Sequence, residues 1–336
     1  MSASIFSCFL LQKSVVMGII ASQTARESQY ICAEKGHRLS NSANKALWIQ
    51  RAIRLLSKLS LPAAQRLGRW VGHILWWFQA GPARVTLTNL EQCFPELPAR
   101  ERHALAKQSL LHTGMVAAEI GAVWEWPAEK ILSLVKEVEG EELIKSAESA
   151  GKGLVLLAPH LGNWEVAGLF FAARYKMAAL YQPPKIEELD DYMRKVRERN
   201  GSELVPANKR GVMRLFHILR EGGVIGILPD QDPELSGGQF APFFGIEANT
   251  IKLVSKLVER TEAKVLCVCA ERLSDSEGFR LVVQEADSLI YSEDLLISVT
   301  ALNRTVENMV NRFPEQYQWE YKRFKRRPEG QRHFYN

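Results

Sequence analysis

The chain has 336 residues, 46% of them hydrophobic and 24% charged, which excludes disorder over most of its length. This is enough for one large α/β domain with a helical attachment. The net charge of +5 is mild, and we expect no nucleic acid as partner. No apolar run reaches the roughly 18 residues that a membrane-crossing helix needs.

Residues 1–44 are mostly polar and lack a sustained period, so we expect a poorly ordered extension there. Residues 45–82 differ, because apolar residues at helical spacing alternate with Arg and Lys. Four tryptophans within this segment are typical of amphipathic helices that lie in the headgroup region of a membrane. The same pattern would also suit amphipathic helices packed on their own domain.

Residues 83–330 form the predicted main domain, which opens with helices that include a long one at about Arg100–Val123. Strand and helix patterns then alternate, which is typical of an α/β fold with a largely parallel sheet flanked by helices. The strands are expected at 153–159, 177–181, 224–228, 264–270 and 279–283. Helices are expected at about 163–174, 186–200, 209–221, 248–262 and 293–313.

The five cysteines are odd in number and lack the spacing of a disulfide scaffold. Cys267 and Cys269 alternate along one predicted strand, so both should face the core as thiols. No second ligand pair lies near them, which argues against a metal site. We therefore expect a reducing compartment, on the cytoplasmic side of any membrane.

The strongest local motif is LVLLAPHLGNWEVAG, in which a buried strand ends directly before His160. Sites in open α/β sheets form at the carboxyl ends of strands. Glu165, in the first turn of a helix capped by Asn163, should reach back and hold one ring nitrogen. The other nitrogen would then be a general base for an alcohol. Alternatively, His160 only caps this helix, and Glu165 sits at its favourable N-terminus.

A second buried strand, at 224–228, ends before Asp230, Gln231 and Asp232. These three residues match the DxD pattern of metal-dependent glycosyltransferases, which is too short to be specific. The chain has no P-loop, GxSxG, HExxH or GxGxxG motif. We therefore expect neither a metal nor a cofactor.

Three blocks resemble a known family. His160 to Glu165 matches the H-x4-D/E motif of glycerolipid-type acyltransferases. In order, APHLGNWE, ILPDQD with a following Phe-Phe-Gly turn, and the segment 314–330 are similar to the bacterial lipid A biosynthesis acyltransferases, the late lauroyl and myristoyl transferases. Two departures are residues 1–44, outside the pattern, and Gln182, where many relatives carry Arg. An ornithine lipid precursor or a lysophospholipid therefore stays open as the acceptor.

The resemblance implies acyl transfer from acyl carrier protein to a hydroxyl of a lipid A precursor, without a covalent intermediate. The reaction would occur at the cytoplasmic face of the inner membrane. His160 would take the hydroxyl proton and Glu165 would orient the imidazole. The backbone N–H groups of Gly162 and Asn163 would receive the developing oxyanion.

The residues themselves suggest further roles in such a reaction. A cation from Arg197 or Arg199 is a second candidate for the oxyanion, and Asp230 and Gln231 would position the acceptor or support that arginine. The basic run Lys322–Arg327 would meet the acidic carrier or lipid phosphates, unless it is a solvated tail. The rival classes are a metal-dependent glycosyltransferase and a non-catalytic peripheral membrane protein attached through residues 45–80.

Overall fold

The computed structural model describes the chain from Ile31 to Tyr335, with side chains from Ser42 onward. The chain is helical from Ile31 to Leu56, so residues 31–44 of the expected poorly ordered extension continue directly into the helix that follows. The rest of that extension, residues 1–30, lies outside the described residues.

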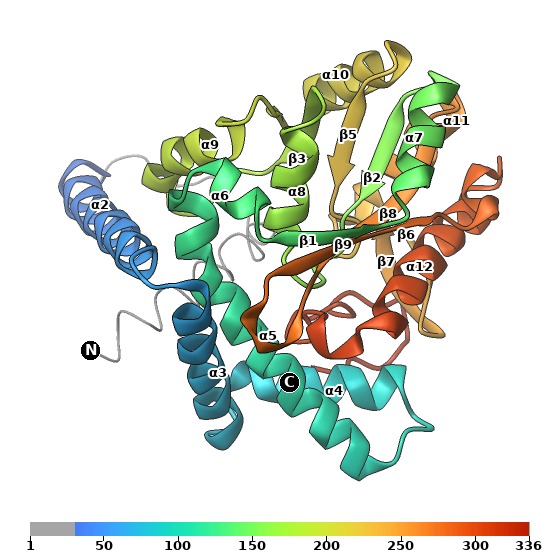
Figure 1. The fold of residues 1–336 in the computed structure, drawn as a ribbon. Coiled ribbons are helices and arrows are strands. Elements are labelled where there is room, and N and C mark those ends of the chain that lie inside the picture. The colour runs from blue at the N-terminus through green and yellow to red at the C-terminus, as the bar shows by residue number, and fades with distance from the viewer. Residues whose placement is uncertain (1–30, 336) are drawn as a thin grey trace.

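A seven-stranded sheet forms the centre of the molecule, in the order β1-β9-β8-β2-β5-β3-β4 (Figure 1). Neighbouring strands are parallel except β8 and β9, which confirms the predicted, largely parallel sheet. Its strands are β1 (Val135–Glu139), β2 (Leu154–Leu157), β3 (Met177–Tyr181), β4 (Glu203–Pro206), β5 (Val224–Ile227), β8 (Lys264–Arg272) and β9 (Phe279–Glu285). The central strands β2 and β5 are buried along their whole length, as expected for continuous apolar runs in a parallel sheet.

A separate antiparallel hairpin of β6 (Gly238–Phe243) and β7 (Ile246–Ile251) lies beside this sheet. Local sequence patterns did not predict this hairpin, β1 or β4. The helix predicted at 248–262 begins later in the structure, at Leu253, because residues 248–251 belong to β7. These strands are only partly buried, so they lack the uniform apolar run of β2 and β5 that predicts a strand.

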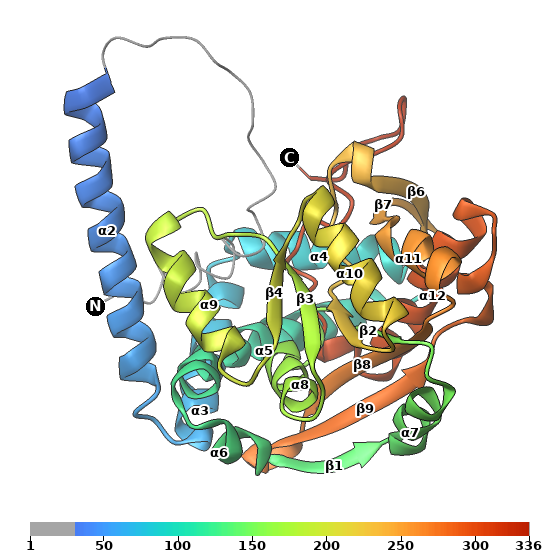
Figure 2. The same cartoon turned by 90° about the horizontal axis from the view of Figure 1, so that it is seen from above.

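Helices cover both faces of the sheet (Figures 1 and 2). Leu154 and Leu156 of β2 pack on the side of α7 and α8, whereas Val155 and Leu157 pack toward α10, α11 and α12. The helix bounds are α7 (Glu141–Ala150), α8 (Trp164–Ala172), α9 (Asp190–Glu198), α10 (Lys209–Arg220), α11 (Leu253–Thr261) and α12 (Leu295–Arg312). Cys267 and Cys269 are unpaired thiols buried on one face, as predicted.

The N-terminal helices are integral to the domain. They are α2 (Ile31–Leu56), α3 (Leu61–Trp77), α4 (Gly81–Cys93), α5 (Ala99–Glu125) and α6 (Ala128–Leu132). Helix α3 packs tightly on α5, since a Cβ at Gly114 would lie 2.1 Å from the carbonyl oxygen of Gly68. Its other face stays open, with Trp70 57% and Trp77 84% exposed. Within residues 31–335, no helix is both long and apolar enough to cross a bilayer.

Candidate active site

The register of β2 and β5 brings His160 and Asp230 together. Leu157 pairs with Ile227, and these residues end their strands. His160 and Asp230 each follow three residues later, directly after a proline. Because parallel strands end at the same edge of a sheet, equal offsets from paired residues place the two side chains side by side.

Asp230 holds the imidazole at two points. Its Oδ1 lies 2.8 Å from His160 Nδ1, and its Oδ2 accepts the His160 backbone N–H at 2.8 Å. The side chains of His160 and Asp230 are only 6% and 2% exposed. Burial alone would raise the pKa of Asp230, but the adjacent His160 charge and these hydrogen bonds outweigh it and lower the pKa.

Tyr317, in the segment that follows α12, donates a further hydrogen bond to Asp230. Burial, followed by the neighbouring Asp230 charge, raises the pKa of this phenol, so it stays protonated and can donate. Asp230 therefore collects donors from both His160 and Tyr317. Tyr317 lies in the block 314–330 that carries the family resemblance, but no local pattern pairs it with Asp230, since 87 positions separate the two residues.

The position of Asp230 also fixes the tautomer of the imidazole. An ionised carboxylate only accepts hydrogen bonds, so Nδ1 of His160 carries the proton and Nε2 keeps its lone pair. The Gln231 amide donates to that Nε2 across 3.0 Å. The imidazole also contacts the Trp164 indole, with ring centroids 4.8 Å apart. Nε2, the nitrogen of His160 that can accept a proton, is thus covered by one side-chain amide that another hydrogen-bond donor can replace.

Glu165 lies in the same site, but its partner differs from the one predicted. Both ring nitrogens of His160 are engaged by Asp230 and Gln231, whereas Glu165 forms a bidentate ion pair with Arg197. The expected contact between Glu165 and the imidazole is therefore absent, because a carboxylate on the neighbouring strand end takes Nδ1 instead. Asp230 and Gln231 were expected to position the acceptor or support an arginine, but in the structure their side chains bind the imidazole of His160.

The predicted oxyanion donors are already occupied. Gly162 N–H donates to the Gln316 carbonyl at 3.1 Å, and Asn163 N–H donates to the Ala270 carbonyl at 2.8 Å. The Asn163 side chain accepts the Val166 N–H, which confirms the predicted helix cap. These backbone groups fasten the loop after β2 and are not free to bind a substrate oxygen.

Arg199 is also committed to structure. Its guanidinium donates to the carbonyls of Val123 and Trp124 at 2.6 Å each, which satisfies groups at the C-terminal end of α5. Arg197 is therefore the better placed of the two predicted cations. Burial would lower the pKa of Arg197, but the Glu165 carboxylate raises it, so the guanidinium stays charged.

A buried ion pair supports the loop that carries His160. Glu119 receives two hydrogen bonds of 2.6 Å from Arg272, and their side chains are 0% and 1% exposed. Glu119 also accepts from the side chains of Gln65 and Asn163, at 2.7 and 2.9 Å. The pair thus links α3, α5 and β8 to the residue that caps α8. Sequence reasoning missed it because Glu119 and Arg272 lie 153 positions apart.

The basic run at Lys322–Arg327 is mostly used within the chain. Arg323 is buried and donates to the Asn249 carbonyl at 2.6 Å, and Arg327 donates to the Glu247 carbonyl at 2.5 Å. Arg326 and Lys325 reach Asp232 at 3.0 and 3.4 Å. The run therefore fastens the hairpin and the loop after β5 and is not a free anion-binding tail.

Asp232 consequently lacks the surroundings of a metal ligand. Its carboxylate meets two cations and also accepts from the Asn249 amide at 2.6 Å. Across the part of the chain that the structure describes, no group of three acidic, histidine or cysteine side chains could hold a metal ion. The DxD interpretation of this loop therefore has no geometric support.

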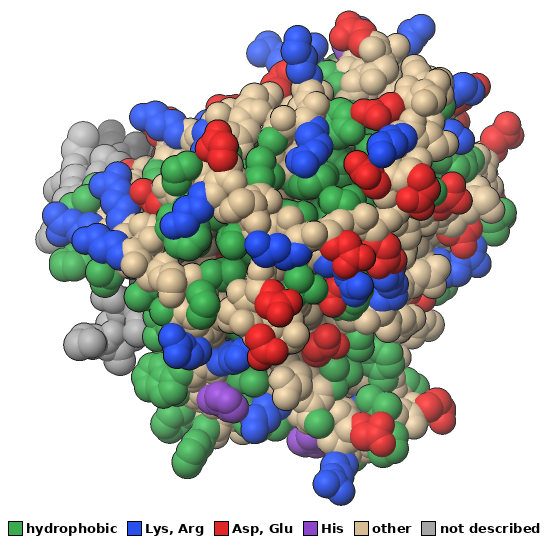
Figure 3. Space-filling view, in the orientation of Figure 1, with side chains coloured by type: hydrophobic (Ala, Val, Ile, Leu, Met, Phe, Trp, Pro, Cys, Tyr) green, Lys and Arg blue, Asp and Glu red, His purple; other side chains and the backbone are tan. Residues whose placement is uncertain are grey.

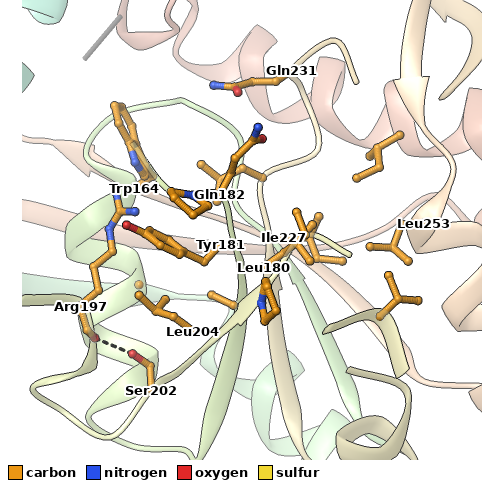
Figure 4. Close-up of a pocket in the computed structure, with 18 of the residues that line it drawn as sticks. Trp164, Leu180, Tyr181, Gln182, Arg197, Ser202, Leu204, Ile227, Gln231 and Leu253 are labelled. Carbon is orange, nitrogen blue, oxygen red and sulfur yellow. Dashed lines mark hydrogen bonds between the residues drawn. The ribbon is translucent and has the colours of Figure 1, made fainter. Parts of the chain in front are cut away.

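A cleft of about 1460 Å³ opens beside His160, larger than the roughly 300–1,000 Å³ of most small-molecule pockets. Figure 4 shows apolar side chains from the sheet and α11 turned into it, with Trp164 and Arg197 along one side: Leu180, Leu204, Ile227 and Leu253. Glu165 and Gln231 also line the cleft. The His160–Asp230 pair therefore meets a large, mostly apolar space, which suits a ligand with both a polar head and a hydrocarbon tail.

The fold and the site together define an α/β enzyme site with a buried imidazole–carboxylate pair at the carboxyl edge of its sheet. Comparison with known proteins agrees with this class. The family described as bacterial lipid A biosynthesis acyltransferase matches residues 38–326. The chain belongs to this family.

Three relatives are named for individual acyl chains, all from Escherichia coli strain K12. A lipid A biosynthesis palmitoleoyltransferase is 29% identical over 295 residues, covering 86% of this chain and 91% of the relative. A lauroyltransferase is 27% identical, covering 82% and 90%. A myristoyltransferase is 28% identical, covering 80% and 82%. The differing acyl names at similar identity mean that overall similarity alone does not define the acyl chain used here.

Proposed function

We propose that this protein transfers a fatty-acyl chain from acyl carrier protein to a hydroxyl of a lipid A precursor. The observation that carries the proposal is the buried His160–Asp230 pair, which opens on a long apolar cleft. The names of the relatives supply the lipid A acceptor and the acyltransferase chemistry. An acyl carrier as donor is the part of the proposal that rests on the sequence resemblance.

His160 acts as the general base in the proposed reaction. The acceptor hydroxyl displaces the Gln231 amide from Nε2 and gives its proton to that nitrogen as its oxygen attacks the thioester carbonyl carbon. A new C–O bond forms and the C–S bond breaks, and the carrier thiol leaves with the proton from the imidazolium. Asp230 stabilises the transient imidazolium through Nδ1, so no covalent acyl-enzyme is required.

Arg197 is the proposed stabiliser of the oxyanion, and Glu165 positions it. The guanidinium keeps its charge on a half-buried side chain, 21% exposed, that lines the cleft, where electrostatic interactions are stronger than in water. The bidentate contact with Glu165 fixes the plane of the guanidinium. Glu165 would thus serve catalysis through Arg197 rather than through His160.

Mass spectrometry of lipids from cells with and without the protein tests the proposed acceptor directly. The expected result is one additional acyl chain on lipid A when the protein is present, and no change in other lipid classes. An added chain on ornithine lipid or a phospholipid instead would replace lipid A as the acceptor. A purified His160→Ala variant should lose about 10²–10⁴-fold of the transfer rate while unfolding like the wild type.

We further propose that the open faces of α2 and α3 rest on the cytoplasmic face of the inner membrane. Trp48, Leu55, Trp77 and Phe78 are 61%, 66%, 84% and 76% exposed, and basic side chains interleave with apolar ones on this side of the molecule (Figure 3). Tryptophan and cations are favoured at an anionic membrane surface. Since α3 also packs on α5, both sequence interpretations of 45–82 can hold at once.

Paired substitutions test this attachment without disturbing the buried face of α3. Trp77→Glu with Phe78→Glu should move the protein out of sedimented anionic vesicles. Leu289→Glu with Leu296→Glu is a matched control, because these side chains are each 48% exposed and lie outside α2 and α3. Unchanged sedimentation of the first variant would place the attachment elsewhere.

A further inference from the structure

The mouth of the cleft carries three lysines that the chain itself does not use. Lys209 begins α10, and Lys252 and Lys256 lie one turn apart at the start of α11. All three line the cleft, and within the described side chains none has a hydrogen-bond or ion-pair partner. We call Lys209, Lys252 and Lys256 the lysine rim. It contrasts with the basic run at the C-terminal end, whose cations are mostly bound internally.

Exposed apolar side chains accompany these cations. Met213 lines the cleft one helical turn after Lys209 and is 51% exposed, and Leu235 projects beside the lining residues Glu234 and Ser236 and is 60% exposed. Glu234 is the acidic residue of this mouth, and Arg326 neutralises it at 3.2 Å. Exposed apolar side chains surrounded by cations are suited to binding another protein. Met is enriched at protein–protein interfaces, and charged side chains steer the encounter of the two partners.

The place of the rim separates it from the proposed membrane face. Figures 1 and 2 both place α10 and α11 away from α2 and α3. A partner bound at the rim would therefore leave the exposed tryptophans of α2 and α3 free to meet a bilayer. Lipid headgroups would reach the cleft from the membrane side, so the rim faces the side that is open to a water-soluble partner.

We propose that the lysine rim docks the acidic protein that carries the acyl group. This inference rests on the proposed function, and it assigns the donor to one mouth of the cleft. The apolar lining from Met213 inward to Ile227 then gives the acyl thioester a path toward His160. Acidic side chains of the carrier would pair with the rim, and its apolar side chains would pack on Met213 and Leu235.

Charge reversal tests the rim. Lys209→Glu with Lys256→Glu should raise KM for the acyl carrier substrate by about 10-fold or more, and should flatten its salt dependence. KM for the lipid acceptor and kcat at saturating donor should stay unchanged. Lys176→Glu with Lys264→Glu is the matched control, since both lysines are exposed and lie at the opposite edge of the sheet, Lys176 directly before β3 and Lys264 as the first residue of β8.

A direct binding measurement keeps this test separate from the proposed function. Holo acyl carrier protein, titrated by calorimetry into detergent-solubilised wild type and variants, should lose affinity only with the rim variant. If binding of the carrier protein depended on the lysine rim but no acyl transfer occurred, the proposed function would be wrong and the docking role of the rim would still hold. Equal binding by all variants would refute the rim, as would a rise in acceptor KM alone, which would assign these cations to acceptor phosphates.

Discussion

Replacing Asp230 by Asn separates the geometry of the site from its charge. The Asn oxygen must accept the buried His160 backbone N–H, which Asp230 now accepts at 2.8 Å. The Asn amide nitrogen then faces Nδ1 and donates to it, so the imidazole proton moves to Nε2. A protonated Nε2 cannot take a proton from the acceptor hydroxyl, so Asp230→Asn should disable the base while keeping the packing.

The magnitude follows from the charge that is lost. An imidazolium and a carboxylate about 4 Å apart attract by about 4 kcal/mol at an effective dielectric constant of about 20. At about 1.4 kcal/mol for each factor of ten, kcat should fall about 10³-fold. KM for either substrate should change little, because Asp230 lies behind the imidazole and does not line the cleft.

The assay is transfer of a radiolabelled acyl chain in detergent, with thermal unfolding to verify that each variant folds. Asp191→Asn, at an exposed residue of α9, controls for the change of a carboxylate to an amide. If Asp230→Asn kept more than about a tenth of the activity while His160→Ala was inactive, the proposed role of Asp230 would be wrong.

Four further predictions concern stability and chemistry. Glu119→Gln should lower the free energy of unfolding by about 3–5 kcal/mol, seen in denaturant titrations, because it leaves Arg272 buried without its counter-charge. Gly162→Ala should impair folding and activity together, since this residue has φ +61° and an added Cβ would lie 2.1 Å from the Ala270 carbonyl oxygen. The lowered pKa of Asp230 means that its stabilising contribution is present above about pH 4 and is lost as pH falls through the folded-state pKa. The stability difference between wild type and Asp230→Asn should therefore shrink in unfolding curves below that pH. Acyl transfer should survive exhaustive chelation of metal ions, because cations of the chain already neutralise Asp232.

The sequence predicted the elements that depend on local patterns. Apolar runs located β2, β5 and β8, and the position of His160 after a strand located the site. Sequence spacing predicts only contacts within one segment, such as that between Glu165 and the imidazole. The actual partner of the imidazole, Asp230, follows the neighbouring strand β5. A signal was present in hindsight, since His160 and Asp230 each follow a buried strand and a proline. Using it required knowing that β2 and β5 are neighbours in register, which depends on the global order of strands.

The other misassignments have the same origin. Arg323 and Arg326 looked like members of a free basic run because a sequence does not reveal which carbonyls and carboxylates will surround them. Glu119 belongs to no motif of the sequence, although it becomes the buried centre of a network. Charged residues whose partners lie far along the chain were therefore the ones that local patterns could not interpret.

The C-terminal segment completes the loop that carries His160, and this has a consequence during synthesis. Gln318 N–H donates to the His160 carbonyl at 3.1 Å, Gln316 accepts the Gly162 N–H, and Tyr317 binds Asp230. The last strand ends at Glu285, so a nascent chain can finish its sheet on the ribosome before these residues emerge. The loop that carries His160 is completed only when residues 316–318 arrive, so a chain terminated before them would pair its strands yet lack these contacts to the loop. Only molecules that contain this segment would then hold the base in place.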